Sequence, residues 1–194
     1  MSSNAWQMLG KGSVLGHLRA DLKQASAEVW VVGPWIDAFF AQILAGSLPA
    51  APELRVITRP LHGASDSFKA HASAARLYFE ERPNTVVKLL DALHAKVIVI
   101  DETVVYCGSA NWYRYSLEEG CELVLRGPAI GVDGLLDALQ TLWDQATHEP
   151  LPETPAEISS TSAGYTKEII DPIAAAKLEE VPGSFVIQQR NRRR

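Results

Sequence analysis

Three observations predict a mixed α/β fold, in which one β-sheet is flanked by helices. Short runs rich in β-branched residues alternate with longer segments of helical periodicity. Two of these runs are separated only by Asp101 and Glu102, which indicates a hairpin and therefore an antiparallel pair. The chain has 194 residues, 47% of them hydrophobic, which is enough to bury a full core. Strands separated by helices early and a hairpin later are typical of a mixed sheet covered by helices.

The elements are expected in the following order. The strands are 28–33, 53–60, two within 86–100, 103–108 and 121–127. The helices are 14–27, 36–46, 65–82 and 131–147. In the third helix an apolar face recurs at helical spacing, at Phe68, Ala72, Ala75 and Phe79.

Composition divides the chain into two parts. After Thr147 the segment HEPLPETPAEISSTSAG contains three prolines and a Ser/Thr cluster, which is typical of a linker. We therefore predict a domain over 1–148 and a C-terminal arm over 149–194, which ends in the Arg-rich RNRRR. Such an arm is a candidate docking segment for a protein partner.

Charge and hydropathy argue against several classes of partner and location. The formal net charge of −5 argues against binding nucleic acid or an anionic membrane through the overall field. No run approaches the ~18 apolar residues of a membrane span, and the N-terminus lacks the pattern of a secretory signal. A cytoplasmic protein without membrane association is expected. Cys107 and Cys121 offer neither a disulfide framework nor metal spacing.

One stretch, LHAKVIVIDETVVYCGSANW, concentrates the polar chemistry. His94 and Lys96 are two positions apart, so on a strand both point to one face. Beyond the hairpin, Gly108 permits close backbone approach, and Ser109 and Asn111 bring a hydroxyl and an amide to the same end of the sheet. An imidazole, an ammonium, a hydroxyl and a carboxamide that converge form a receptor for a tetrahedral oxyanion. No acidic cluster offers the oxygen ligands of Mg²⁺ or Ca²⁺, so neither a metal nor another cofactor is expected.

The spacing His-x-Lys-x₄-Asp-x₆-Gly-Ser-x-Asn resembles the motif of the phospholipase D superfamily, the HKD proteins. The matching positions are His94, Lys96, Asp101, Gly108, Ser109 and Asn111. Where that family has Asn-x-Glu, this chain reads Gly120-Cys121-Glu122, so the Glu is retained and the Asn is absent. The resemblance covers about residues 10–147 and implies the family's mixed sheet flanked by helices, with one motif per chain. Structural roles are expected for Asp101, at the turn, and for Gly108.

The resemblance also implies a mechanism. His94 would attack phosphorus and form a phosphohistidine that water resolves. Lys96 and Asn111, with Ser109 behind them, would stabilise the charge on the non-bridging oxygens. Glu122 would accept a hydrogen bond from the far ring nitrogen of a histidine.

A second histidine must protonate the leaving oxygen, yet the chain has one His-x-Lys pair. A symmetric homodimer supplies the second copy, as in the single-motif, Nuc-type endonuclease branch of the family. His62 is the first alternative acid within one chain.

The chain is short and lacks a membrane-directing segment, which favours a nuclease over a lipid enzyme, with DNA ahead of RNA as substrate. Loops after the early strands nominate Trp35, Arg59 and His62 as substrate-groove residues, whereas Trp112 is expected in the core. Two alternatives stay open: a lipid phosphodiesterase, and a non-catalytic nucleic-acid-binding or assembly subunit of a DNA-processing or defence system.

Overall fold

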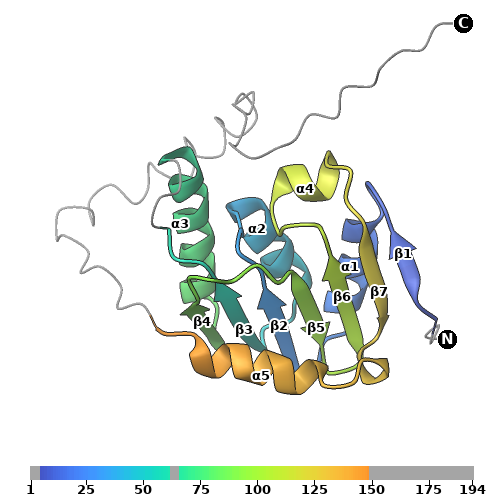
Figure 1. Ribbon diagram of the computed structural model, residues 1–194. Coiled ribbons are helices and arrows are strands. Elements are labelled where there is room, and N and C mark those ends of the chain that lie inside the picture. Colours follow the sequence, from blue (N-terminus) through green and yellow to red (C-terminus); the bar gives the residue numbers. More distant parts are fainter. Residues whose placement is uncertain (1–4, 62–65, 149–194) are drawn as a thin grey trace, which may run out of the picture. The chain divides into compact units, whose positions relative to one another are not determined.

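A computed structural model describes residues 5–61 and 66–148 and confirms the mixed sheet flanked by helices (Figure 1). The arm predicted over 149–194 lies outside the described residues. The strands are β1 (Gln7–Leu9), β2 (Glu28–Val32), β3 (Glu53–Thr58), β4 (Thr85–Leu89), β5 (Val97–Ile100), β6 (Val104–Gly108) and β7 (Val124–Pro128). The helices are α1 (Val14–Leu22), α2 (Ala38–Ser47), α3 (Asp66–Glu81), α4 (Arg114–Glu118) and α5 (Leu135–Gln145), with a 3₁₀ turn, η1, at Ala129–Gly131.

The sheet has seven strands in the order β1-β7-β6-β5-β2-β3-β4. β2, β3 and β4 run parallel, whereas β5 pairs antiparallel with β2 and every later pairing is antiparallel. The ends of β2, β3, β4 and β6 therefore lie at the same edge as the starts of β5 and β7. We call this the upper edge, because it is at the top of the sheet in Figure 1; it comprises 33–37, 59–61, 90–96, 109–113 and 120–123.

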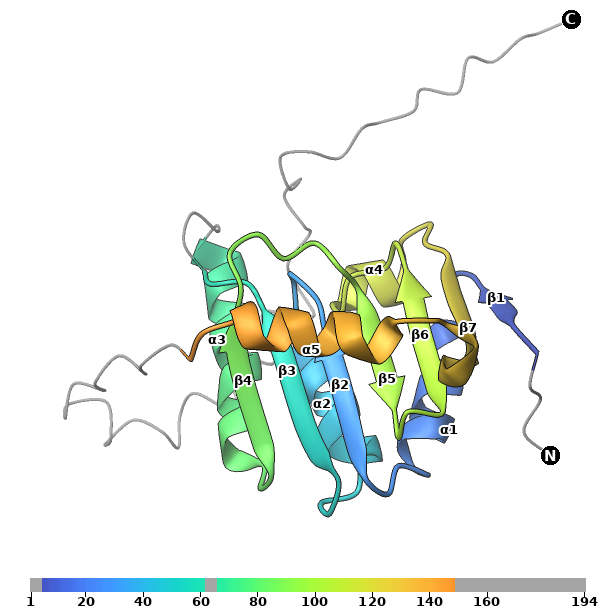
Figure 2. The ribbon, with the colours of Figure 1, turned by 60° about the horizontal axis from the view of Figure 1, so that its bottom comes forward.

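Both faces of the central strands are buried. Val29 and Val31 of β2 pack in the core beneath α1, α2 and α3, whereas Trp30 and Val32 pack in a second core with Leu139 of α5. Figure 2 shows α5 crossing the strands on the face away from the other long helices. Burial on both faces explains why β2 reads as a continuous apolar run instead of alternating.

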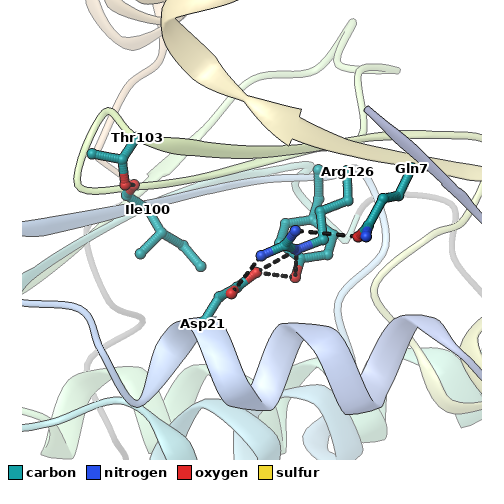
Figure 3. Close-up of polar contacts among 6 residues, drawn as sticks. Gln7, Asp21, Ile100, Thr103 and Arg126 are labelled. Atoms are coloured by element: carbon teal, nitrogen blue, oxygen red, sulfur yellow. Dashed lines mark hydrogen bonds and ion pairs between the residues drawn. The ribbon is translucent and has the colours of Figure 1, made fainter. Parts of the chain in front are cut away.

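The hairpin between β5 and β6 forms one residue longer than predicted. Ile100 pairs with Val104, so three residues connect the strands. Asp101 and Glu102 have positive φ angles of 49° and 53°, and both the amide and the hydroxyl of Thr103 donate to the Ile100 carbonyl, at 2.9 and 3.1 Å. Ile100 and Thr103 lie together in Figure 3.

A half-buried ion pair fastens α1 to the sheet (Figure 3). Arg126 of β7 donates to both carboxylate oxygens of Asp21, each at 2.7 Å, and to the side chain of Gln7 at 3.2 Å. The fully buried Tyr106 donates its hydroxyl to Asp21, and burial followed by the Asp21 contact raises the pKa of that phenol. The polar side chains between α1 and this part of the sheet are thus hydrogen-bonded to one another.

Some elements differ from the sequence expectation. The first helix ends at Leu22 instead of continuing to residue 27, and β1 and α4 were not predicted. His94 and Lys96 were expected on a strand, but β5 begins only at Val97. The sheet order gives the reason: β4 and β5 are separated by β3 and β2, so the chain from 90 to 96 must cross the upper ends of those strands (Figure 2).

Within the described ranges no helix is both long enough and apolar enough to cross a bilayer.

Candidate active site

The loop 90–96 carries His94 and Lys96 across the upper edge. It is anchored where the Leu90 amide donates to the Thr58 carbonyl at 2.9 Å and where Leu93 is buried in the α5-side core. His94 is exposed and Lys96 is half-buried. The Lys96 ammonium lies 3.5 Å from Nε2 of His94 and donates to the His94 carbonyl at 2.9 Å. The two side chains therefore share one face, although they precede the strand.

The ammonium of Lys96 is partly withdrawn from water. Burial lowers its pKa, and the negative charge of Glu122 acts in the opposite direction. A cation with reduced solvation interacts more strongly with an incoming anion than a fully hydrated one does. Lys96 is thus suited to bind an oxyanion beside the His94 ring.

Gly108 lets two strands meet closely at this edge. A Cβ at Gly108 would lie 2.1 Å from the Leu123 carbonyl oxygen, so only glycine fits between β6 and the start of β7. Directly beyond it, the Ser109 amide donates to the same carbonyl at 3.1 Å, and the Leu123 amide donates to Ser109 Oγ at 3.2 Å. This pairing holds Ser109 next to Glu122.

Glu122 is held by two hydroxyl groups. Ser109 donates to its Oε2, and Ser116 of α4 donates to its Oε1 at 2.7 Å. Ser116 is buried and also accepts the Asn111 amide at 3.0 Å, so it links the Gly-Ser-x-Asn turn to Glu122. Within the described part of one chain, Glu122 accepts from these hydroxyls and not from a histidine.

The Asn111 side chain has an unused acceptor. Its Oδ1 is buried and has no hydrogen-bond partner among the described residues. Beside it, burial and then the charge of Glu122 raise the pKa of the Tyr113 phenol, whereas the Asn111 and Ser116 side chains oppose this rise. An unpaired buried polar atom costs about 1–3 kcal/mol, so this acceptor calls for an explanation such as a water, an ion or a catalytic role.

Asp101 lies at the opposite edge of the sheet from His94, at the far end of β5. Its carboxylate accepts the amides of Ser26, Ala27 and Glu28 at 2.7, 2.9 and 3.0 Å and the Ser26 hydroxyl at 2.9 Å. Burial alone would raise the pKa of Asp101, but these hydrogen bonds outweigh it and lower the pKa. Asp101 thus holds the turn that leads into β2.

Two of the nominated groove residues lie together at the upper edge. The Arg59 guanidinium is 5.5 Å from the centre of the Trp35 ring, and both side chains are half-buried. They follow β3 and β2, whose ends the loop 90–96 crosses. His62, the third nominated residue, lies outside the described residues.

Trp112 is fully buried, as the sequence analysis expected. Its Nε1 donates to the Val32 carbonyl at 2.8 Å, and its ring stacks on Phe40 at 5.6 Å between centroids. A Cβ at Gly33 would lie 2.4 Å from this ring. Trp112 therefore packs the Gly-Ser-x-Asn turn against the end of β2 and against α2.

Ser116 and Tyr113 were not predicted from the sequence to belong to the site. Both lie in or beside α4, which has only five residues and shows no detectable periodicity. The available signal was a hydroxyl residue five positions after Asn111.

Among residues 5–61 and 66–148, no group of three or more His, Cys, Asp or Glu side chains is arranged to hold a metal ion. Independence from metals remains a prediction.

Comparisons with known proteins bear on the family and the fold. Residues 18–128, more than half of the chain, match the family described as "Cardiolipin synthase, PLD-like domain". No curated protein is a significant match. Among solved structures, NucT from Helicobacter pylori is similar with a TM-score of 0.59 and 16% identity, covering 75% of this chain and 99% of that one. Nuc from Salmonella typhimurium, a phospholipase D family member, has a TM-score of 0.57 and 13% identity, covering 73% and 97%.

A third similar structure is the archaeal chromatin protein TrmBL2, with a TM-score of 0.54 and 9% identity, covering 76% of this chain and 55% of that one. At these identities the likeness concerns the fold.

Proposed function

The chain belongs to the phospholipase D-like (PLD-like) family, and from this premise we propose that it is a metal-independent nuclease that works as a homodimer. DNA is proposed ahead of RNA as its substrate. The observation that carries the proposal is the position of the Lys96 ammonium, 3.5 Å from Nε2 of His94, at the edge that also holds Asn111. This pairs a nucleophile with a cation suited to a phosphate oxygen.

The proposed reaction has two steps. Nε2 of His94 attacks phosphorus, a nitrogen–phosphorus bond forms, and the bond to the leaving oxygen breaks. The protonated His94 of the partner subunit gives its proton to that oxygen. Water then attacks phosphorus and gives a proton to the partner's His94. The new oxygen–phosphorus bond forms as the nitrogen–phosphorus bond breaks, which frees the first His94 and leaves the partner's His94 protonated again. The Lys96 ammonium and the side-chain NH2 group of Asn111 stabilise the negative charge in both transition states.

The homodimer is proposed because the mechanism requires two imidazoles. Among histidines whose side chains the structure describes, only His94 has a lysine ammonium within 3.5 Å. Two copies related by a two-fold axis would place one His94 on each side of a shared phosphate. The same arrangement would let Glu122 meet an imidazole.

One specific observation favours a second candidate, a DNA-binding subunit without turnover. Both carboxylate oxygens of Glu122 already accept from Ser109 and Ser116. Within residues 5–61 and 66–148, no carboxylate of the same chain bonds to the His94 ring. In that case Lys96 and Asn111 would grip a phosphate without cleaving it.

One assay separates these functions. EDTA-treated protein is incubated with single- and double-stranded DNA, RNA, a bis-aryl phosphodiester and phosphatidyl substrates in detergent micelles, beside a His94→Ala control. We expect cleavage of nucleic acid and of the bis-aryl diester, and none by the variant. Binding without cleavage would support the second candidate. Cleavage confined to phosphatidyl substrates would indicate a lipid enzyme, and Mg²⁺-dependent cleavage that persists in the variant would refute the mechanism.

A further inference from the structure

A groove lies between α1 and α2, on the face of the sheet away from α5. It has a volume of about 300 Å³ and opens to solvent. Its lining combines two cations, two apolar side chains and three small or polar residues: Arg19, Lys23, Phe39, Ile43, Gln42, Gly46 and Ser47. None of these residues belongs to the HKD motif.

The groove is basic although the chain carries a net charge of −5. Arg19 and Lys23 are exposed, and in the described part of the chain neither forms an ion pair. Asp21 lies between them in sequence, but its carboxylate already accepts hydrogen bonds from Nε and Nη2 of Arg126. The two cations are therefore free to bind an anion.

One end of the groove is tied to the motif turn. The Asp37 amide donates to the Trp112 carbonyl at 3.2 Å, and the Asp37 carboxylate accepts the amides of Phe40 and Arg114, both at 2.9 Å. The start of α2, and with it Phe39, is thus held against the segment that follows Asn111. Arg114 lies over the Phe39 ring at 5.7 Å, although its own charge is paired with Glu118.

We infer that this groove binds the backbone of a single polynucleotide strand whose scissile phosphate lies at the upper edge. Arg19 and Lys23 are one helical turn apart, about 6 Å along the axis, and contact neighbouring phosphates. Phe39 offers a ring face to a base. The inference rests on the proposed function, because it takes the substrate to be nucleic acid.

The dimensions and charge favour a strand over other anions. Along α2 the lining extends from Phe39 to Ser47, about 12 Å along the helix axis, so the groove is long enough for more than one phosphate of a strand. The groove opens to solvent, as a strand that continues beyond it requires. Because the overall field is unfavourable, a strand must be held by local cations of this kind.

The test measures binding without cleavage. Full-length His94→Ala protein, with and without Arg19→Gln and Lys23→Gln, is titrated with a fluorescent single-stranded 20-mer at several salt concentrations. Loss of two phosphate contacts on a single strand should reduce the slope of log K against log salt by about 1.4 and weaken binding about ten-fold or more at low salt. The matched control carries Leu136→Glu and Ala138→Glu, exposed positions of α5 on the other face, and has the same change in net charge.

The control should bind the 20-mer as the parent does. Equal affinity and equal salt slope for the groove variant would overturn the inference, as would an equal loss in the control. A loss seen with phosphatidylserine vesicles but not with the 20-mer would assign the groove to a lipid surface and would also overturn it. Hydrolysis of the bis-aryl diester by wild-type protein judges the proposed function separately, because that substrate is too small to reach the groove.

Discussion

At the scale of single residues, Lys96 supplies the positive charge beside His94. Its ammonium is 3.5 Å from the imidazole, and burial lowers its pKa. We predict that Lys96→Ala reduces kcat for the bis-aryl diester by about 10²–10³, the effect of losing one donor in comparable oxyanion sites. Lys96→Arg, which keeps the charge, should lose less. Equal rates for wild type and Lys96→Ala would remove Lys96 from the mechanism.

Asp101 contributes to stability instead of chemistry. Its carboxylate accepts three backbone amides and one hydroxyl. We predict that Asp101→Asn lowers the free energy of unfolding at neutral pH by about 1–2 kcal/mol, allowing for the partial exposure of the group. Urea denaturation measures this. Asp91→Asn, at an exposed turn position, is the control and should change little.

The effect of Asp101 should also depend on pH. Its pKa is lowered on folding, so its stabilisation is fully present above the unfolded value of ~3.9. The stabilisation is lost as the pH falls through the lower folded value. Wild type and Asp101→Asn should therefore differ by a constant amount near neutrality and converge in strong acid. A difference that grew on acidification would contradict this assignment.

At the scale of elements, Gly108 sets the distance between β6 and the start of β7. A Cβ there would meet the Leu123 carbonyl at 2.1 Å, a backbone atom that cannot rotate away. Gly108→Ala should cost about 1–3 kcal/mol of stability and should displace Glu122, with loss of activity. Gly16→Ala in α1, where a Cβ meets nothing within 4 Å, should instead gain about 0.5–1 kcal/mol. Denaturation curves of the two variants compare them directly.

α4 acts on the site through Ser116. The hydroxyl of Ser116 accepts a hydrogen bond from the backbone amide of Asn111 and donates one to Glu122, so Ser116 is a positioning residue. Ser116→Ala should lower kcat about ten-fold with little change in KM, because the affected groups act on the transition state. Thr141→Ala removes a hydroxyl from α5 and should leave kcat unchanged. If Ser116→Ala altered stability alone, its role would be confined to packing.

How far these elements could be predicted depends on the length and period of each pattern. β2 is almost entirely apolar, β3 is rich in β-branched residues, and α3 has a clear helical period, so all three could be predicted. β1 has three residues and α4 has five, too few to establish a period. We predicted a strand that includes His94 and Lys96 because these two polar residues are two positions apart, the spacing of side chains on one face of a strand. Only the sheet order, a long-range property, shows that the loop 90–96 is a crossing.

Site prediction had a similar limit. The motif spacing brought His94, Lys96, Ser109 and Asn111 to one edge, where the structure also has them. Asp101 belongs to the same motif but lies at the far edge, because one short strand separates it from Lys96. Ser116 is outside the motif, and its contact with Glu122 follows from the fold of α4.

At the scale of the whole molecule, the dimer is the central expectation. Exposed apolar side chains lie on β1, on β7 and just before β7: Met8, Leu125 and Leu123 are 59%, 37% and 58% exposed. An obligate interface buries on the order of 2,000 Å² or more, and covering these residues would contribute to it. Mixed dimers of wild type and His94→Ala should be severely impaired instead of half active, because each catalytic event uses both histidines.

The most direct test combines light scattering with intact-mass spectrometry. For the mass measurement, the protein is quenched during turnover in EDTA and is not exposed to acid. The account predicts a homodimer that carries one phosphoryl adduct per two chains on His94, and no adduct in His94→Ala. An active monomer, one adduct per chain, or turnover without any adduct on His94 would contradict the shared phosphohistidine site.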